Sequence, residues 1–239
     1  MNKEFTTLIK EEQQKKKENK KDMLYDTQES ASKDDLVMEA SLKYASKRQG
    51  EFTLEDYYAL PDDRRVELID GVIYDMAAPN TAHQATVVEI AVQLKNYIDS
   101  RGGKCLAFMS PVDVQLDCDE RTMVQPDVLV VCDRDKVIRR CVYGAPDLVV
   151  EIVSPSSERK DHIIKLAKYI NAGVREYWIV DLRQEKVIVY DIEHDGRTTI
   201  YGMDKPIPVQ IFGGDCQIFF EEIIDLVRSI LNSPGSDES

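Results

Sequence analysis

The feature of the sequence that most constrains the fold is a carboxylate inside an apolar strand. The run Asp147–Val153 is β-branched or apolar at almost every position, which is typical of a strand buried on both faces of a sheet. Glu151 lies in this run, and burying an ionised glutamate is costly unless the glutamate is paired or binds a cation. A second run of this kind, Val128–Val131, directly follows Asp127. Two apolar strands with one acid each predict a metal site at a sheet edge.

Strand geometry selects Asp127 and Glu151 as the pair. Side chains alternate along a strand, so Asp147 shares a face with Glu151 but lies roughly 13 Å from it. Neighbouring strands are roughly 5 Å apart, which brings Asp127 within reach. Mg²⁺ prefers oxygen ligands, commonly one or two carboxylates completed by water and substrate phosphate. The pair therefore predicts a magnesium ion, with manganese as a substitute, that activates a water for attack on a phosphate.

Phosphoryl chemistry also needs a fixed cation near the attacked phosphorus, and a lysine can supply it. The commonest position, two residues after the glutamate, is occupied here by Val153. A helix is expected over residues 161–172, and its polar residues form one stripe at every fourth position: Asp161, Lys165 and Tyr169. Apolar residues with core-like spacing lie on another face: Ile163, Ala167 and Ile170. We expect Lys165 to project from this helix into the site.

Each candidate also has a structural interpretation. Asp127 could be a turn residue at the start of its strand, Glu151 could form a buried salt bridge with Lys165, and Lys165 could pair with Asp161 on the helix surface. Gln125 either orients a water or caps the strand. Structural roles are favoured for the remaining polar and aromatic candidates. Tyr169 is expected to pack in the interior, His83 to cap its helix or contact solvent, and Trp178 to lie in the core. No Gly-x-Ser-x-Gly motif is present around Ser154–Ser157, which excludes a serine hydrolase of that type.

Turn and capping signals predict the remaining elements. Asp70-Gly71 between two apolar runs is a strong hairpin signal. Thr81 and Gln84 have capping-box spacing and are expected to open a long helix that ends near Ser100. The other expected elements are a short helix at 54–60 capped by Thr53, strands at 105–109 and 112–116, a hairpin at 176–192, a final strand after Gly196 and a helix at 220–231.

Composition restricts the class of protein. The chain has 239 residues, of which 43% are hydrophobic, so it can bury a core without disulfides or a structural metal. With 31 basic and 44 acidic residues the net charge is −13, which disfavours nucleic-acid binding through a broad basic face. The five cysteines form no CxxC pair and the three histidines are scattered, which excludes an ordinary zinc site. We expect free thiols, no signal peptide, no membrane span and a cytoplasmic location.

Several motifs occur in an order that resembles a known family. These are residues 66–71 (VELIDG), 125–127 (QPD), 147–156 (DLVVEIVSPS) and the Asp161, Lys165, Tyr169 stripe followed by Gly173-Val174 and Glu176-Tyr177-Trp178. The order resembles the Uma-type restriction-endonuclease-like proteins of the PD-(D/E)XK nuclease superfamily, over about residues 51–230. The resemblance implies an α/β restriction-endonuclease-like core, a mixed central sheet flanked by helices, with an added β-hairpin and a C-terminal helix.

The resemblance also implies site residues. Asp127 and Glu151 would be magnesium ligands, Glu67 would be an auxiliary acid near the metal, and Lys165 would replace the lysine missing at Val153. The catalytic set expected from it is therefore Asp127, Glu151, Lys165 and Glu67, with Asp127, Glu151 and Glu67 at the metal.

The sequence thus predicts three segments: a charged extension at 1–50, disordered or partly helical, a restriction-endonuclease-like domain at 51–231, and a disordered tail at 232–239. The expected function is that of a magnesium-dependent phosphodiesterase, a DNA endonuclease, with no membrane partner and with homodimerisation by analogy to nucleases that cut two strands. The alternative is a catalytically silent module that binds protein or nucleic acid. The acidic composition favours this alternative over an active nuclease. A phosphatase or nucleotide hydrolase using the same residues is a third interpretation.

Overall fold

The computed structural model describes residues 47–61, 63–154, 157 and 159–233. The chain divides into two units, Met1–Lys47 with Ala59–Pro61, and Arg48–Tyr58 with Asp62–Ser239. Every helix and strand described below belongs to the second unit. The expected extension and tail lie almost entirely outside the described residues, so the division into three segments stays a prediction.

The helices are α3 (Leu54–Tyr58), α4 (Thr81–Ser100), α5 (Leu166–Ala172) and α6 (Glu221–Leu231), with the 3-10 turns η1 (Arg134–Lys136) and η3 (Gln210–Phe212) and the π-helix η2 (Lys160–Lys165). The strands are β1 (Val66–Ile69), β2 (Val72–Asp75), β3 (Leu106–Met109), β4 (Val114–Gln115), β5 (Val128–Val131), β6 (Val142–Tyr143), β7 (Leu148–Ile152), β8 (Glu176–Asp181), β9 (Lys186–Asp191), β10 (Arg197–Gly202), β11 (Ile207–Val209) and β12 (Cys216–Ile218).

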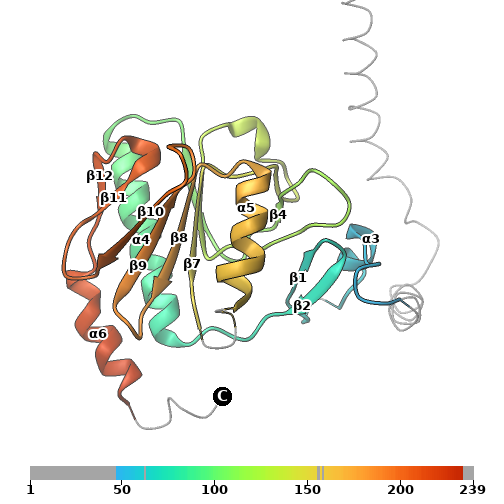
Figure 1. The fold of residues 1–239 in the computed structure, drawn as a ribbon, viewed down its shortest axis with the longest axis horizontal. Coiled ribbons are helices and arrows are strands. Elements are labelled where there is room, and N and C mark those ends of the chain that lie inside the picture. Colours follow the sequence, from blue (N-terminus) through green and yellow to red (C-terminus); the bar gives the residue numbers. More distant parts are fainter. Residues whose placement is uncertain (1–46, 62, 155–156, 158, 234–239) are drawn as a thin grey trace, which may run out of the picture. The chain divides into compact units, whose positions relative to one another are not determined.

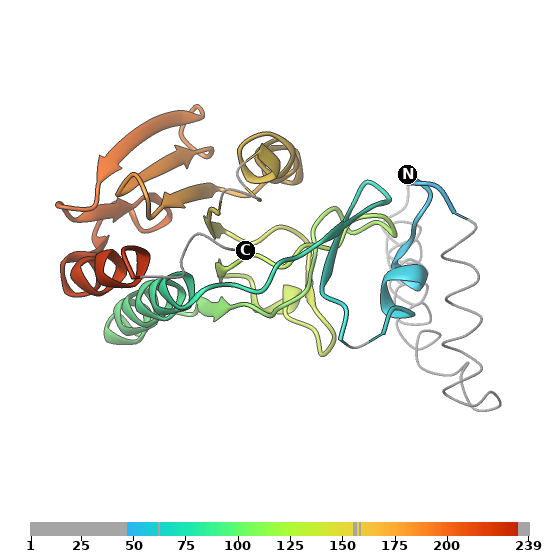
Figure 2. The ribbon, with the colours of Figure 1, turned by 90° about the horizontal axis from the view of Figure 1, so that it is seen from below.

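The central sheet is mixed and has six strands in the order β10-β9-β8-β7-β5-β3. Only β7 and β8 are parallel neighbours, and the η2–α5 segment connects them. Figures 1 and 2 show α4 and α6 on one face of the sheet and α5 on the other. This arrangement confirms the predicted α/β fold, in which helices flank a mixed central sheet.

Alternation along the strands builds a core on each face. One core joins even-numbered strand residues to α4 and α6, for example Val128, Val150, Trp178, Ile90, Leu94 and Val227. The other joins odd-numbered strand residues to the η2–α5 face, for example Leu129, Val149, Ile179, Tyr177 and Tyr169. Glu151 is odd-numbered, and it therefore faces the second core, where it is 4% exposed.

The hairpin β1–β2 places Glu67 near the sheet. Its two turn residues adopt left-handed conformations, Asp70 with φ 52° and Gly71 with φ 78°, as the Asp-Gly signal predicts. Leu68 pairs with Met123 through backbone hydrogen bonds of 2.8 and 2.7 Å. This pairing fixes the hairpin against the segment that leads into β5.

Three sequence expectations about local structure are wrong. Asn80, not Thr81, caps α4, because its side chain accepts the hydrogen bond from the backbone N–H of His83 at 2.8 Å. The strand after Gly196 is not the last, since β11 and β12 follow as a short antiparallel pair. Two of the five cysteines, Cys105 and Cys132, are joined by a disulfide, so the expectation of free thiols holds only for the other three.

Among the described residues, no helix is long and apolar enough to span a bilayer.

Candidate active site

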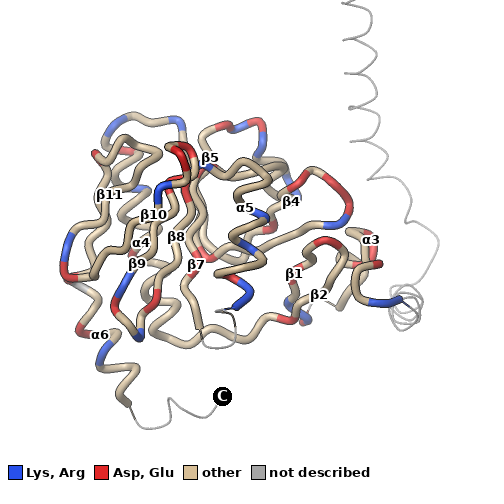
Figure 3. Tube along the Cα trace, in the orientation of Figure 1, with Lys and Arg blue, Asp and Glu red and all other residues tan. Residues whose placement is uncertain are grey.

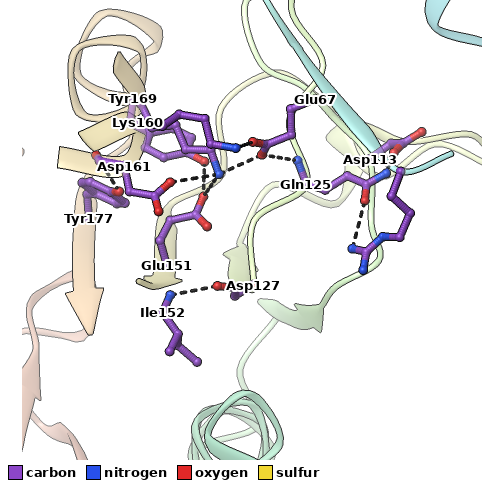
Figure 4. A network of polar contacts seen from close by, with 12 residues as sticks. Glu67, Asp113, Gln125, Asp127, Glu151, Ile152, Lys160, Asp161, Tyr169 and Tyr177 are labelled. Carbon is purple, nitrogen blue, oxygen red and sulfur yellow. Dashed lines mark hydrogen bonds and ion pairs between the residues drawn. The ribbon is translucent and has the colours of Figure 1, made fainter. Parts of the chain in front are cut away.

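Asp127 and Glu151 come together as the strand geometry predicts. β5 and β7 are antiparallel neighbours in which Val128 is opposite Val150, and one further step of this register places Asp127 opposite Glu151. The Oδ2 atom of Asp127 accepts the backbone N–H of Ile152 at 2.8 Å. Figure 4 shows this bond at the end of the two strands. The two acids therefore lie side by side at one end of the sheet.

Glu151 accepts two hydrogen bonds at a single oxygen. Its Oε1 is 2.8 Å from Nζ of Lys165 and 2.7 Å from the hydroxyl of Tyr169. Burial raises the pKa of Glu151, the Lys165 ammonium opposes the rise, and the nearby acids Asp161, Asp127 and Glu67 add to it. The net result is a pKa of Glu151 well above the usual range, chiefly because the carboxyl group is buried.

Lys165 is the centre of the cluster, as expected from its place on the helix. Its Nζ lies 2.7 Å from Oε1 of Glu67, 2.8 Å from Oε1 of Glu151 and 3.4 Å from Oδ1 of Asp161, and its side chain is 3% exposed. Burial alone would lower the pKa of Lys165, but the surrounding carboxylates hold it well above the usual range. Lys165 is therefore a buried ammonium ion shared by three acids.

Glu67 reaches Lys165 from β1, while its role at a metal stays a prediction. Its Oε2 accepts a hydrogen bond from Nζ of Lys160 at 2.8 Å, and its Oε1 accepts the backbone N–H of Gln125 at 3.1 Å. Burial raises the pKa of Glu67, but Lys165 and Lys160 outweigh it, so that the pKa is lowered overall. Glu67 is thus an ionised acid with no exposed surface.

The sequence analysis did not identify Lys160. It precedes Lys165 by five residues, which puts it off the stripe of an α-helix, but η2 is a π-helix with i→i+5 hydrogen bonding. Both lysines therefore reach Glu67, as Figure 4 shows for Lys160. The only signal in the sequence is that a lysine directly precedes the expected helix at 161–172.

The prediction of which face of this helix is buried was wrong. The stripe Asp161, Lys165 and Tyr169 is buried against the sheet, whereas Ile163 is 61% exposed and Ile170 is 47% exposed. The polar stripe is inside because it meets Glu151 and Glu67, not because of its hydropathy. Periodicity alone does not reveal a helix whose polar face is buried and whose apolar face is exposed.

His83 was expected to cap its helix or contact solvent, and this expectation is wrong because its side chain contacts Asp127. Its Nε2 lies 3.1 Å from Oδ2 of Asp127, and its Nδ1 is buried without a hydrogen-bond partner in the described part of the chain. The cap formed by Asn80 fixes the first turn of α4, from which His83 reaches β5. His83 therefore contacts the same carboxylate oxygen of Asp127 that accepts the backbone N–H of Ile152.

Gln125 extends the site into a polar network away from the sheet. Its Nε2 donates to Oδ1 of Asp113 at 2.9 Å and to the hydroxyl of Tyr57 at 3.0 Å, and its Oε1 accepts from Arg65 at 3.3 Å. The expected strand-cap role is close to this finding, because the backbone N–H of Gln125 binds Glu67. Figure 4 shows Asp113, Gln125 and Glu67 in succession.

The donor chemistry of the cluster fits a divalent cation that prefers oxygen. Glu67, Glu151 and Asp161 contact the two lysines, and Asp127 lies beside Glu151. Full ionisation of these four acids leaves two negative charges in excess. The Oδ1 atom of Asp161 is buried and accepts no hydrogen bond in the described residues. Across those residues, no group of three or more His, Cys, Asp or Glu side chains converges as a ready coordination sphere. The Lys165 ammonium occupies the centre instead.

Comparisons with known proteins agree with this architecture. Residues 54–214 match the family model described as "Uma2: Putative restriction endonuclease". An uncharacterized protein of Synechocystis sp., slr1290, is 31% identical over 132 residues, which are 54% of this chain and 67% of that protein. The crystal structure of a "putative nuclease belonging to DUF820" from Anabaena variabilis superposes with a TM-score of 0.61 at 19% identity and covers 74% of this chain and 99% of its own. The family match spans more than half of the chain, and the chain therefore belongs to the Uma2 family of restriction-endonuclease-like proteins.

Proposed function

We propose that this chain is a magnesium-dependent DNA endonuclease whose metal ligands are Asp127 and Glu151, assisted by Glu67. The observation that carries the proposal is that Asp127 lies opposite Glu151 at the strand ends while Nζ of Lys165 is 2.8 Å from Glu151, although the position two residues after Glu151, where a lysine is expected, is a valine. The family and the fold support nuclease chemistry in general. The cofactor, the DNA substrate and the endonucleolytic mode are proposed here on the chemistry of the site.

When bound, Mg²⁺ would polarise a water and neutralise charge on the scissile phosphate. Asp127 would present the oxygen that is not used by His83 and the backbone of Ile152. Glu151 would exchange Lys165 for the ion, whose positive charge favours the ionised carboxylate that burial disfavours. Lys165 would then be free to stabilise negative charge that develops on the phosphate, while Lys160 keeps Glu67 ionised.

One observation supports the silent-module alternative. Lys165 already forms ion pairs with three acids, so these acids have a counter-ion without a metal. A phosphatase acting on a small substrate would use the same residues. A cleavage assay separates these alternatives from the nuclease.

The test is a plasmid-nicking assay with Mg²⁺ or Mn²⁺ that compares the wild type with Glu151→Gln. The substitution keeps the side-chain shape and removes the charge needed at the metal, so we expect cleavage to fall about a hundredfold or more. Wild-type cleavage rates in Glu151→Gln would refute the assignment of the site, and a wild type without cleavage under either metal would favour the silent module.

Glu176→Gln is a matched control. Glu176 is a second fully buried glutamate, and it accepts hydrogen bonds from Nε1 of Trp178 at 2.6 Å and from the backbone of Ile211 at 2.9 Å. Because it starts β8 at the opposite end of the sheet from Glu151, its substitution should leave cleavage by the folded protein intact. Thermal melting of both variants separates loss of chemistry from loss of fold.

A further inference from the structure

A groove of about 350 Å³ lies beside the candidate active site and has no assigned role. The segment after β3 and the segment before and within β6 form it. Its apolar wall consists of Phe108, Pro111, Val112, Ile138 and Val142. Arg139, Arg140 and Asp113 add charged groups to the same groove. More of the lining surface is polar than apolar, which suits a ligand that has both a charged part and an apolar part.

The two arginines are available to bind an anion. Neither has an ion pair with any described residue, and the Arg140 guanidinium lies over the Tyr58 ring, 3.3 Å from its centroid. Both arginines are exposed, so an anion can approach them from the solvent. A guanidinium group binds a phosphate with paired hydrogen bonds. The pair therefore favours a phosphate at the groove.

Asp113 supplies an acceptor in a fixed position. Its Oδ1 accepts hydrogen bonds from the hydroxyl of Tyr57 at 2.9 Å and from Nε2 of Gln125 at 2.9 Å. Its Oδ2 has no hydrogen bond among the described residues. A carboxylate oxygen of this kind accepts from an exocyclic amino group, such as N4 of cytosine, and repels the O4 carbonyl of thymine.

Two hydrogen-bonded routes connect the groove with the candidate active site. The backbone N–H of Ser110, next to the groove residue Pro111, donates to the backbone carbonyl of Asp127 at 2.9 Å. Gln125 joins Asp113 to Glu67 through its side chain and its backbone N–H, respectively (Figure 4). The groove therefore opens at the same end of the sheet as the metal-binding acids.

We propose that the groove is a nucleotide subsite, which takes one nucleotide of a single-stranded stretch of the substrate next to the cleaved bond. The phosphate of that nucleotide binds Arg139 and Arg140, its base packs on the apolar wall, and an exocyclic amino group of the base donates to Asp113. Cytosine, adenine and guanine carry such a group, and thymine does not. The inference rests on the proposed nuclease function.

Fluorescence anisotropy in a low-salt buffer with EDTA tests the subsite without metal or cleavage. The probes are short fluorescein-labelled oligo-dC and oligo-dT strands. The wild type is expected to bind oligo-dC about five- to tenfold more tightly than oligo-dT. Arg139→Ala should weaken both complexes about five- to tenfold and reduce the salt dependence by the equivalent of one phosphate contact. Arg197→Ala is the control, because Arg197 is an exposed arginine on β10, at the other edge of the sheet from β3.

Two further variants test the base-binding part. Asp113→Asn exchanges the free acceptor for a donor and should abolish the preference for oligo-dC, while Ile138→Trp should fill the groove and weaken both probes. Equal affinity of wild type and Arg139→Ala, or no preference between the probes in the wild type, would overturn the subsite. Either result leaves the nuclease proposal standing if Glu151→Gln still abolishes cleavage. A non-cleaving wild type that retains these binding differences would overturn only the nuclease.

Discussion

Among single residues, Tyr169 is expected to stabilise the fold through its hydroxyl without taking part in catalysis. Tyr169 is fully buried and donates to Oε1 of Glu151 at 2.7 Å. Tyr169→Phe should lower the free energy of unfolding by about 1–2 kcal/mol, because a buried hydrogen bond to a charged acceptor is lost. Cleavage should continue, since the Tyr169 hydroxyl is neither a proposed metal ligand nor a proposed phosphate contact.

Urea unfolding and plasmid nicking check this prediction. Tyr177→Phe is the control, because the Tyr177 hydroxyl is also buried but donates to the backbone carbonyl of Asp161 at 3.1 Å instead of Glu151. If Tyr169→Phe were as inactive as Glu151→Gln while still folded, Tyr169 would have to be reassigned from support to chemistry.

His83 is expected to hold the carboxylate of Asp127 in its orientation for the metal. His83→Ala leaves Oδ2 of Asp127 with one donor, the backbone of Ile152, and should weaken Mn²⁺ binding about tenfold, as for other residues that orient metal ligands. His83→Gln can present a donor at a similar position and should restore part of the affinity. Isothermal titration with Mn²⁺ measures both.

His194→Ala is the matched control for this effect. His194 also contacts an aspartate, with its Nδ1 2.9 Å from Oδ1 of Asp191, but it lies beyond β9 and has no contact with the site. Unchanged Mn²⁺ affinity in His83→Ala would mean that the contact with Asp127 has no role in metal binding.

The acidic residues of the site could be identified from the sequence, whereas some of the basic residues that contact them could not. Glu151 could be identified because a buried charge in an apolar strand is costly, and strand spacing then selected Asp127. Lys160 and His83 could not be identified in this way. Lys160 reaches Glu67 only through the π-helical turn, and His83 reaches Asp127 only through the placement of α4 against the sheet. Both depend on tertiary geometry that a spacing rule does not contain.

At the scale of elements, the η2–α5 segment buries its polar face and exposes its apolar face, because Lys165 pairs with acids inside the protein. Lys165→Met would leave Glu67 and Glu151 buried without their shared counter-ion, which should cost about 3–5 kcal/mol in EDTA. Mn²⁺ should recover more stability in this variant than in the wild type, because the ion supplies the missing positive charge. Thermal melting with and without Mn²⁺ gives both values.

Lys168→Met on the same helix provides the comparison. Nζ of Lys168 pairs with Asp70 and Asp117, but Asp70 is 65% exposed, so the loss should be about 1 kcal/mol or less and insensitive to Mn²⁺. If Lys165→Met melted at the wild-type temperature in EDTA, the buried ion cluster would not be formed in solution.

Elements with strong local signals could be predicted from the sequence. The β1–β2 hairpin follows from a dipeptide that tolerates positive φ, and β5, β7 and β8 follow from long apolar runs. Local signals failed where two choices are equally good in sequence, as for the adjacent polar residues Asn80 and Thr81. They also failed for β11, which has three residues, one of them a proline.

At the scale of the whole molecule, the acidic charge limits how nucleic acid can bind. The net charge is −13, and Figure 3 shows basic and acidic residues interspersed along the trace. Three basic side chains near the site are candidates for phosphate contacts: Lys160, Arg139 and Arg140. Binding should therefore depend on these few contacts and on a divalent ion that offsets the acids.

The salt dependence of duplex DNA binding measures this directly. Each phosphate contact contributes about −0.9 to the slope of log K against log salt, so three contacts predict a slope of about −2 to −3, with Ca²⁺ present to oppose repulsion by the acids. Lys160→Met should make the slope shallower by about one, whereas Lys205→Met, in the connection from β10 to β11, should not change it. A slope of about −6 or steeper would require a broad basic face, which the interspersed charges of the described residues do not provide. DNA binding would then have to be assigned to other parts of the chain or to a second copy of it.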